Sequence, residues 1–221
     1  MPKDHGIGAP VKRREDVRFL TGAGNYTDDI NLPRQLYVHF LRSEVAHGRI
    51  DGIDTAEAET MPGVVRIFTG KDFEGMGGLP CGWQVTDRHG QPMQEPAHPV
   101  LAQGKVRHVG DPVAAVVAET REQARDAAEA IALDIEELPA VVDMKAALED
   151  GAPKVHDDLA GNLCYDWGFV EENKAAVDEA IRNAHHVTTL ELVNQRLAPN
   201  AMEPRVAVGD YQRATDESTL Y

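Results

Sequence analysis

The strongest structural signal of the chain lies in residues 105–120, which read KVRHVGDPVAAVVAET. Lys105 to Val109 predicts a strand, and Gly110-Asp111-Pro112 predicts the turn that follows it. Val113 to Ala118 contains no polar residue, which is typical of a strand that is buried on both faces. The centre of the chain therefore predicts a sheet whose faces other elements must cover.

A helix is predicted directly after this strand pair. Thr120 is followed three residues later by Gln123, the pattern of a capping box at a helix N-terminus. Small or apolar residues then recur on one helix face, at Ala124, Ala127, Ala128 and Ile131. Such a face can lie close against a sheet. Ile131 to Glu137 predicts a further strand, so this part of the chain is expected to run strand–strand–helix–strand.

Towards the N-terminus, alternating and β-branched stretches predict three more strands, at Gln35–Leu41, Arg49–Asp54 and Val64–Thr69. Thr55 is expected to cap a short helix through Glu59. A helical turn is expected at Glu15–Leu20. Residues 70–104 are rich in Gly and Pro and are expected to be a long irregular loop.

Beyond residue 137 the pattern changes. A short helix at Ala146–Leu148 precedes the linker Gly151–Asn162, where we place a domain boundary. A strand at Tyr165–Glu171, a helix at Asn173–Ala184 and a β-rich run at His185–Arg196 are expected to follow. The last residues, Ser218–Tyr221, begin a strand pattern that stops, so we expect a piece of a longer protein. The expected domains are residues 1–14 (an extended arm), 15–150 (an α/β domain) and 151–221 (the start of another domain).

The composition excludes some classes of partner. The chain has 37 acidic and 22 basic residues, for a net charge of −15, which disfavours nucleic acid and membrane surfaces. Cys81 and Cys164 are the only cysteines and form no C-x-x-C motif, so no disulfide framework, zinc site or iron–sulfur site is expected. No secretory leader and no apolar span are evident. The expected location is the cytoplasm.

The chemistry-bearing residues do not form a recognisable site. The glycines before Tyr26 fail the dinucleotide fingerprint, because Thr27 stands where the third glycine is needed. His185 and His186 would point to opposite faces of a strand, and the other seven histidines occur singly, so no metal site is expected. Asp28 and Asp29 are expected to accept hydrogen bonds from turn amides. No histidine can be placed beside Cys81 to activate its thiol.

Several stretches nevertheless resemble one family, the large molybdenum-binding subunit of the molybdenum hydroxylases (xanthine dehydrogenase, aldehyde oxidase and carbon monoxide dehydrogenase). Residues 41–50 are similar to the family's RSPHAHARI but depart from it at Glu44-Val45 and Gly48. The block at 105–120 is the most specific. The matching stretches occur in the family's order and cover nearly the whole chain, at residues 7–30, 41–50, 105–120, 138–143 and 194–205.

The resemblance implies a fold and an activity. The fold class is α/β (α+β): a hammerhead domain over roughly residues 15–145, then the first strands and helix of a molybdenum-binding domain. The complete enzyme would hydroxylate a purine, aldehyde or N-heterocycle, or oxidise carbon monoxide, with oxygen from water. It would hold molybdenum on molybdopterin cytosine dinucleotide, with 2Fe–2S clusters and FAD on partner subunits or domains. The implied partners are the rest of the molybdenum-binding subunit, the iron–sulfur and FAD subunits, and in some cases a second copy.

The resemblance assigns no catalytic or metal-binding residue to this chain. Glu203 and Arg205 match the family's Met-Glu-Pro-Arg and are the candidates for residues near the cofactor. Gln84 does not align with the glutamine beside molybdenum, and the loop at residues 75–99 does not identify the substrate. We therefore expect the isolated chain to be structural and inactive, with an exposed apolar surface. The alternative is a stand-alone hammerhead module that binds a partner without chemistry.

Overall fold

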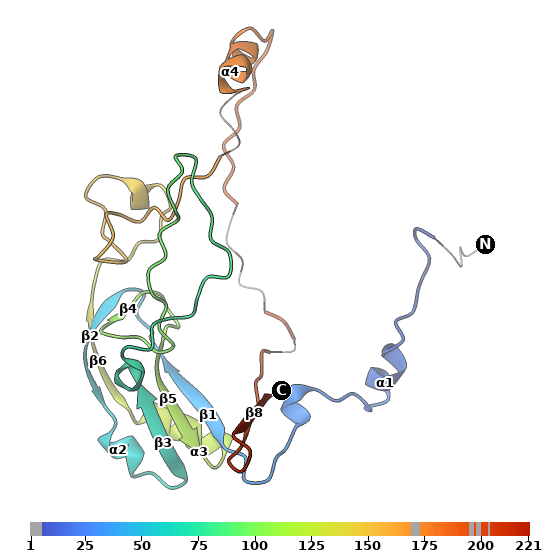
Figure 1. Ribbon diagram of the computed structural model, residues 1–221, viewed down its shortest axis with the longest axis vertical. Helices are drawn as coiled ribbons and strands as arrows, with labels where there is room; N and C mark the ends of the chain where they lie inside the picture. Colours follow the sequence, from blue (N-terminus) through green and yellow to red (C-terminus); the bar gives the residue numbers. More distant parts are fainter. Residues whose placement is uncertain (1–5, 169–172, 195–196, 198–199, 203) are drawn as a thin grey trace. The chain divides into compact units, whose positions relative to one another are not determined.

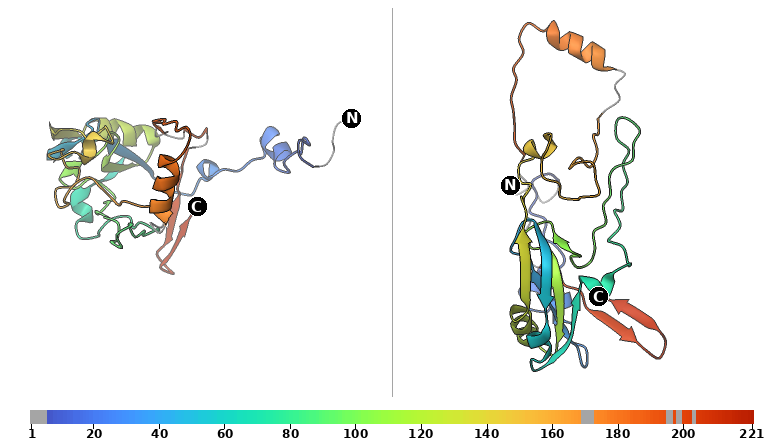
Figure 2. Two further views of the ribbon diagram at one scale, coloured as in Figure 1. Left: turned by 90° about the horizontal axis from the view of Figure 1, so that it is seen from above. Right: turned by 90° about the vertical axis from the view of Figure 1, so that its left-hand side faces the viewer.

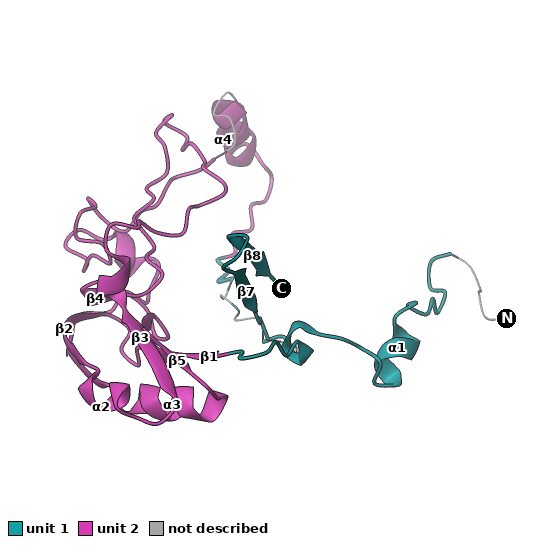
Figure 3. Cartoon of the chain, turned by 60° about the horizontal axis from the view of Figure 1, so that its bottom comes forward, with its two compact units in different colours: residues 1–35, 191–221 teal, residues 36–190 magenta. Residues whose placement is uncertain are grey.

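The computed structural model describes residues 6–168, 173–194, 197, 200–202 and 204–221. Contacts within the chain divide it into two compact units, one of residues 36–190 and one of residues 1–35 with 191–221 (Figure 3). Each unit is described by itself. The boundary that we place near residue 151 stays a prediction.

The larger unit contains two three-stranded antiparallel sheets (Figure 1). In each sheet, neither partner of the central strand is its neighbour in the sequence, so the strand pairings are long-range. The first sheet has the order β1 (Tyr37–Arg42), β5 (Pro112–Ala118), β3 (Val64–Thr69). The second has the order β4 (Lys105–Val106), β2 (Gly48–Asp54), β6 (Ala132–Glu137).

Strand β5 is the buried centre of the first sheet. It pairs along its whole length with β1 and over most of it with β3, so that Ala118 faces both Tyr37 and Val64. Helix α3 (Arg121–Glu129) packs on β1 and β5. The core between helix and sheet consists of small and branched side chains: Ala58, Ile67, Ala114, Val116, Ala127, Ala128 and Ile131. The predicted helix face, sheet and buried strand are confirmed.

A second buried cluster joins the two sheets. Val113 of β5, Val106 of β4 and Ala102 form its centre, and Ile53 of β2 packs against this cluster and the first one. Gly48 permits the close approach of β2 to β6, because a Cβ atom there would lie 2.3 Å from the Cγ2 atom of Ile135. Ile53 therefore links the two apolar clusters, one of which lies between α3 and the first sheet and the other between the two sheets.

The short elements show which local predictions hold. The capping box of α3 is confirmed: the Thr120 hydroxyl accepts from the Gln123 amide, and the Gln123 side chain accepts from the Thr120 amide. Thr55 is the N-cap residue of α2 (Ala56–Glu59) as predicted, but its hydroxyl accepts no hydrogen bond from the first turn. The Asp54 carboxylate accepts from the Ala56 amide instead. The helical turn predicted near residue 15 is present as α1 (Asp16–Leu20).

Strand β4 is shorter than predicted and ends at Val106 instead of Val109. The backbone turns there because the Asp111 carboxylate accepts from the Arg107 amide. The Ser43 amide donates to the Asp111 carbonyl, and the Gly110 amide donates to the Ser43 carbonyl. The loop that follows β3 begins with the 3₁₀ helix η2 (Gly70–Phe73). An isolated bridge between Thr86 and Pro92 interrupts the otherwise irregular loop.

Beyond residue 140 the predicted helices are confirmed as η3 (Ala146–Leu148) and α4 (Lys174–Arg182). The strand predicted at Tyr165–Glu171 is absent over residues 165–168, and its last residues lie outside the described part of the chain. The strand predicted at His185–Arg196 is wrong for residues 185–194, whose side chains are exposed. A strand needs a neighbour for its backbone groups, and the described residues supply none here.

The smaller unit contains α1, the 3₁₀ helix η1 (Thr27–Asp29) and a hairpin of β7 (Gly209–Gln212) with β8 (Glu217–Leu220). The final strand that the sequence predicts is thus confirmed as β8. The Asp29 carboxylate accepts from the Tyr26 amide, as expected of a turn residue.

The two threonines predicted as caps form a matched pair for a stability test. Replacing Thr120 with Ala removes the acceptor for the Gln123 amide, and we expect a loss of about 1 kcal/mol in the free energy of unfolding. Thr55→Ala removes no capping hydrogen bond, only the exposed one from Thr55 to Glu59, and should cost about a few tenths of 1 kcal/mol. Urea titration followed by circular dichroism measures both, and equal losses would contradict the assigned caps.

The helix–sheet contact gives a second prediction. Ala127 is a fully buried residue of α3. Ala127→Leu should therefore overpack the core and lower the free energy of unfolding by about 1–3 kcal/mol. Ala176 lies on α4 with an exposed side chain, and Ala176→Leu is the control that should leave stability nearly unchanged. The midpoint of thermal unfolding compares the two, and a neutral Ala127→Leu would mean that α3 does not lie against the sheet as described.

Candidate functional site

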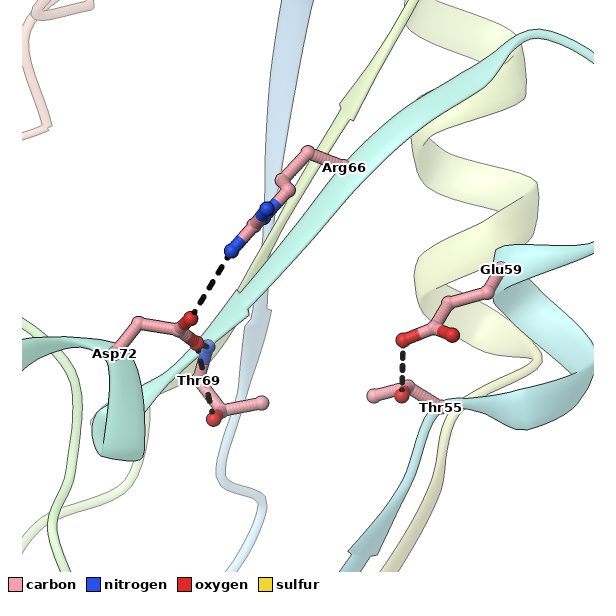
Figure 4. Close-up of polar contacts among 5 residues, drawn as sticks. All are labelled: Thr55, Glu59, Arg66, Thr69 and Asp72. Atoms are coloured by element: carbon pink, nitrogen blue, oxygen red, sulfur yellow. Dashed lines mark hydrogen bonds and ion pairs between the residues drawn. The ribbon is translucent and has the colours of Figure 1, made fainter.

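One hollow of about 450 Å³ lies along β3, the edge strand of the first sheet, between α2 and η2. Its polar side chains come from α2, β3, η2 and the residue before α2, and Figure 4 shows them. The lining residues are Thr55, Glu59, Val64, Val65, Arg66, Ile67, Thr69 and Asp72.

The Asp72 carboxylate contacts two neighbouring residues of the hollow, Thr69 and Arg66. Its Oδ2 atom accepts from the Thr69 amide at 2.8 Å, which closes the first turn of η2, and its Oδ1 atom lies 3.5 Å from Nη2 of Arg66. The Thr69 amide is the main cause that lowers the pKa of Asp72, and the Thr69 hydroxyl and Arg66 act in the same direction. The carboxylate is therefore charged at neutral pH and holds no proton to donate.

The remaining groups are also bound locally. The Thr55 hydroxyl donates to Oε1 of Glu59 at 2.7 Å, and the Arg66 guanidinium lies over the Phe68 ring. Nucleophilic catalysis needs a hydroxyl or thiol beside a base that can take its proton, and acid–base catalysis needs a group near its titration point. In this hollow the Thr55 hydroxyl lies beside the Glu59 carboxylate, and their contact joins the two ends of α2. The hollow is a polar surface feature that stabilises the local turns.

The candidate cofactor residues do not meet in this hollow. Arg205 is exposed and belongs to no helix or strand, and Glu203 lies outside the described residues. Gln84 hydrogen-bonds to Glu95 in the irregular loop. Cys81 is exposed, and its thiol contacts the backbone oxygen of Trp83 at 3.3 Å. Neither these contacts nor the exposure of Arg205 was evident from the sequence.

The histidines give no metal site in the described part of the chain, where no three His, Cys, Asp or Glu side chains are grouped suitably. The pair His185-His186 does not lie in a strand, so the geometric reason for separating them does not apply. His47 is buried, and its Nδ1 atom lies 2.9 Å from the carbonyl oxygen of Pro139. A carbonyl oxygen only accepts, so Nδ1 bears the proton.

His47 belongs to a small charged cluster with Arg107, His156 and Asp157. Burial is the main cause that lowers the pKa of His156, and the charges of Arg107 and His47 add to it against the opposing carboxylates of Asp158 and Asp157. Nζ of Lys105 lies 2.6 Å from Asp157, and this contact lowers the pKa of that carboxyl. The cluster holds residues 156–157 beside strand β4. No sequence motif indicates this cluster, because its members are far apart along the chain.

Comparison with known proteins identifies the class to which this arrangement belongs. Residues 21–139 match the family described as "Aldehyde oxidase and xanthine dehydrogenase, a/b hammerhead domain". The chain belongs to this family, and its two sheets with α3 are the hammerhead domain. The resemblance and the α/β fold class inferred from the sequence are confirmed.

The relatives are subunits of molybdenum hydroxylases. The chain is 36% identical over 215 residues to the nicotine 6-hydroxylase large subunit of Paenarthrobacter nicotinovorans, covering 97% of this chain and 25% of that protein. It is 32% identical to the carbon monoxide dehydrogenase large chain of Afipia carboxidovorans, covering 99% of this chain and 27% of that one. The chain therefore spans about a quarter of the length of these relatives.

Solved structures of related enzymes support the same family assignment. The chain superposes on quinoline 2-oxidoreductase from Pseudomonas putida 86 with a TM-score of 0.79 and 35% identity, covering 99% of this chain and 27% of that one. The Cu,Mo-CO dehydrogenase gives a TM-score of 0.62 at 34% identity, covering 82% of this chain and 23% of that one. No helix among the described residues is long and apolar enough to cross a bilayer.

The lowered pKa of His156 predicts the pH dependence of stability. The unfolded chain binds a proton at this ring more readily than the folded chain, so stability is full at higher pH and falls as the pH drops through histidine's ordinary titration range. His156→Gln should make the decrease in unfolding free energy shallower between about pH 8 and about pH 5. Urea titrations across this range measure it, and parallel curves for the two proteins would contradict the assignment.

Proposed function

We propose that this chain is the N-terminal portion of the large, molybdenum-binding subunit of a molybdenum hydroxylase. The observation that supports this most directly is the match of the hammerhead family over residues 21–139, together with relatives that match nearly the whole chain. The complete enzyme hydroxylates a purine, an aldehyde or an N-heterocycle with oxygen from water, or oxidises carbon monoxide. Relatives named for nicotine, quinoline, carbon monoxide and xanthine span this range.

The complete enzyme holds molybdenum on molybdopterin cytosine dinucleotide and passes electrons through 2Fe–2S clusters to FAD on partner subunits. A relative described as subunit gamma of a dehydrogenase complex supports an assembly of several subunits. We place this assembly in the cytoplasm. The described residues do not fit such a cofactor by themselves, because Arg205 is exposed and no metal-binding group is present among them.

In this proposal the chain is a scaffold of the enzyme. Its interior is filled by Val, Ile and Ala side chains, and the polar groups of the hollow along β3 are bound to one another. The residues that bind the cofactor and turn over the substrate belong to the remainder of the large subunit. Glu203 and Arg205 are the positions of this chain that we assign nearest to that cofactor.

Metal analysis tests the proposal. The purified chain alone should contain no molybdenum, whereas the chain co-expressed with the remainder of the large subunit and its partner subunits should contain about one molybdenum per large subunit, since the cofactor site needs segments that this chain lacks. Inductively coupled plasma mass spectrometry with intact mass gives both values.

Either of two results would contradict it. Stoichiometric molybdenum on the chain alone would mean that this quarter of the subunit holds the cofactor. Absence of molybdenum from the complete assembly would favour the alternative, a hammerhead module that binds a partner without chemistry.

A further inference from the structure

The irregular loop after η2 contains an ordered two-limbed arm. Its limbs, residues 78–87 and 91–98, are joined by backbone hydrogen bonds from the Leu79 amide to His98 (2.8 Å) and from the Met93 amide to Val85 (3.0 Å). The tip closes through the Asp87 carboxylate, which accepts from the amides of His89 and Gln91. The arm runs away from the sheets (Figure 2, right).

Glycine permits the close approach of the limbs. A Cβ atom on Gly78 would lie 2.4 Å from the backbone nitrogen of His98, so no other residue fits without moving a limb. Gly90 at the tip has a positive φ of 77°, which glycine adopts without strain. These two glycines therefore permit the shape of the arm, which is an ordered part of the long loop.

A third segment, residues 163–168, lies along the arm. The Gln94 amide donates to Cys164 at 2.8 Å, and the Arg88 amide donates to Asp166 at 2.9 Å. The Arg88 guanidinium also forms an ion pair with the Asp166 carboxylate at 2.9 Å and contacts the Trp167 carbonyl. These contacts join parts of the chain about 78 residues apart and give the arm a defined surface.

Both tryptophans of the protein lie on this surface. Trp83 is 79% exposed and Trp167 is 56% exposed, and Leu79 and Tyr165 of the same segments are exposed as well. A tryptophan side chain buries roughly 150–250 Å² when it is covered, and tryptophans are enriched among the residues that dominate binding at interfaces. Two exposed tryptophans on one ordered arm mark an interaction surface.

We propose that this arm, residues 78–98 with 163–168, is a docking surface for the part of the large subunit that lies outside this chain. The inference rests on the proposed function. The relatives are about four times as long as this chain, since it covers 25–27% of them, and they match 97–99% of it. Most of the large subunit therefore lies outside this chain. The interior of the hammerhead domain is already filled by its own apolar side chains. The arm presents both tryptophans of the protein as exposed apolar contact area.

Fluorine NMR tests the surface directly. The chain is labelled with 5-fluorotryptophan, so its two resonances both arise from the arm, and the unlabelled remainder of the large subunit is then added. Both resonances should shift and broaden on binding, because the rings move from water into a protein contact. Binding without any change at the two resonances would overturn the inference while leaving the proposed function standing.

Variants give a second readout. Trp83→Ser should leave the melting temperature of the chain unchanged, because the side chain is exposed, and should weaken binding of the remainder on the order of tenfold or more. Val65 is exposed to 54% on β3, outside the arm, and Val65→Ser is the control that should bind like the wild type. Equal affinities of Trp83→Ser and wild type, measured by biolayer interferometry, would also overturn the inference.

The remaining outcomes separate the possible occupants. If the remainder does not bind the wild-type chain at all, the proposed function fails together with the inference. Resonance shifts that depend on the concentration of the chain alone would assign the arm to a second copy and overturn the inference. Resonance shifts that appear only when the iron–sulfur or FAD subunit is added would assign the arm to that subunit and would also overturn the inference.

Discussion

The burial of β5 is the constraint on which the rest of the structure depends. A strand without polar side chains must be covered on both faces, and its backbone groups need a hydrogen-bonding neighbour on each edge. β1 and β3 supply the two edges, α3 covers one face, and Val113 points into the cluster that joins the second sheet. The alanines of α3 matter because small side chains let the helix approach the sheet closely.

The same packing determines where polar side chains gather among the described residues. Its interior is filled by apolar side chains, and the polar groups of the β3 hollow are bound to one another at the ends of α2 and η2. Catalytic groups must instead converge on a space that a substrate can enter. In a chain that spans a quarter of its relatives, such convergence is expected only when the other segments are present.

The sequence predicted the hammerhead elements well because their signals are local. β5, α3 with its Thr120 cap, and the strands β1, β2, β3 and β6 follow from composition and spacing within a few residues. Thr55 lies at the predicted N-cap position of α2, but its hydroxyl donates to Glu59, and the Asp54 carboxylate accepts from the Ala56 amide. The strand expected at residues 185–194 was wrong: β-branched composition favours a strand, but a strand exists only beside another.

The sequence by itself therefore determined the identity of the main elements, the domain family and the absence of a familiar catalytic motif, since each of these is written in short stretches. Only the tertiary structure decided that β5 pairs with β1 and β3, that β2 lies between β4 and β6, and that Arg88 meets Asp166. These contacts join residues far apart in the chain. Their partners are selected by shape, burial and backbone pairing in three dimensions, which no local pattern specifies.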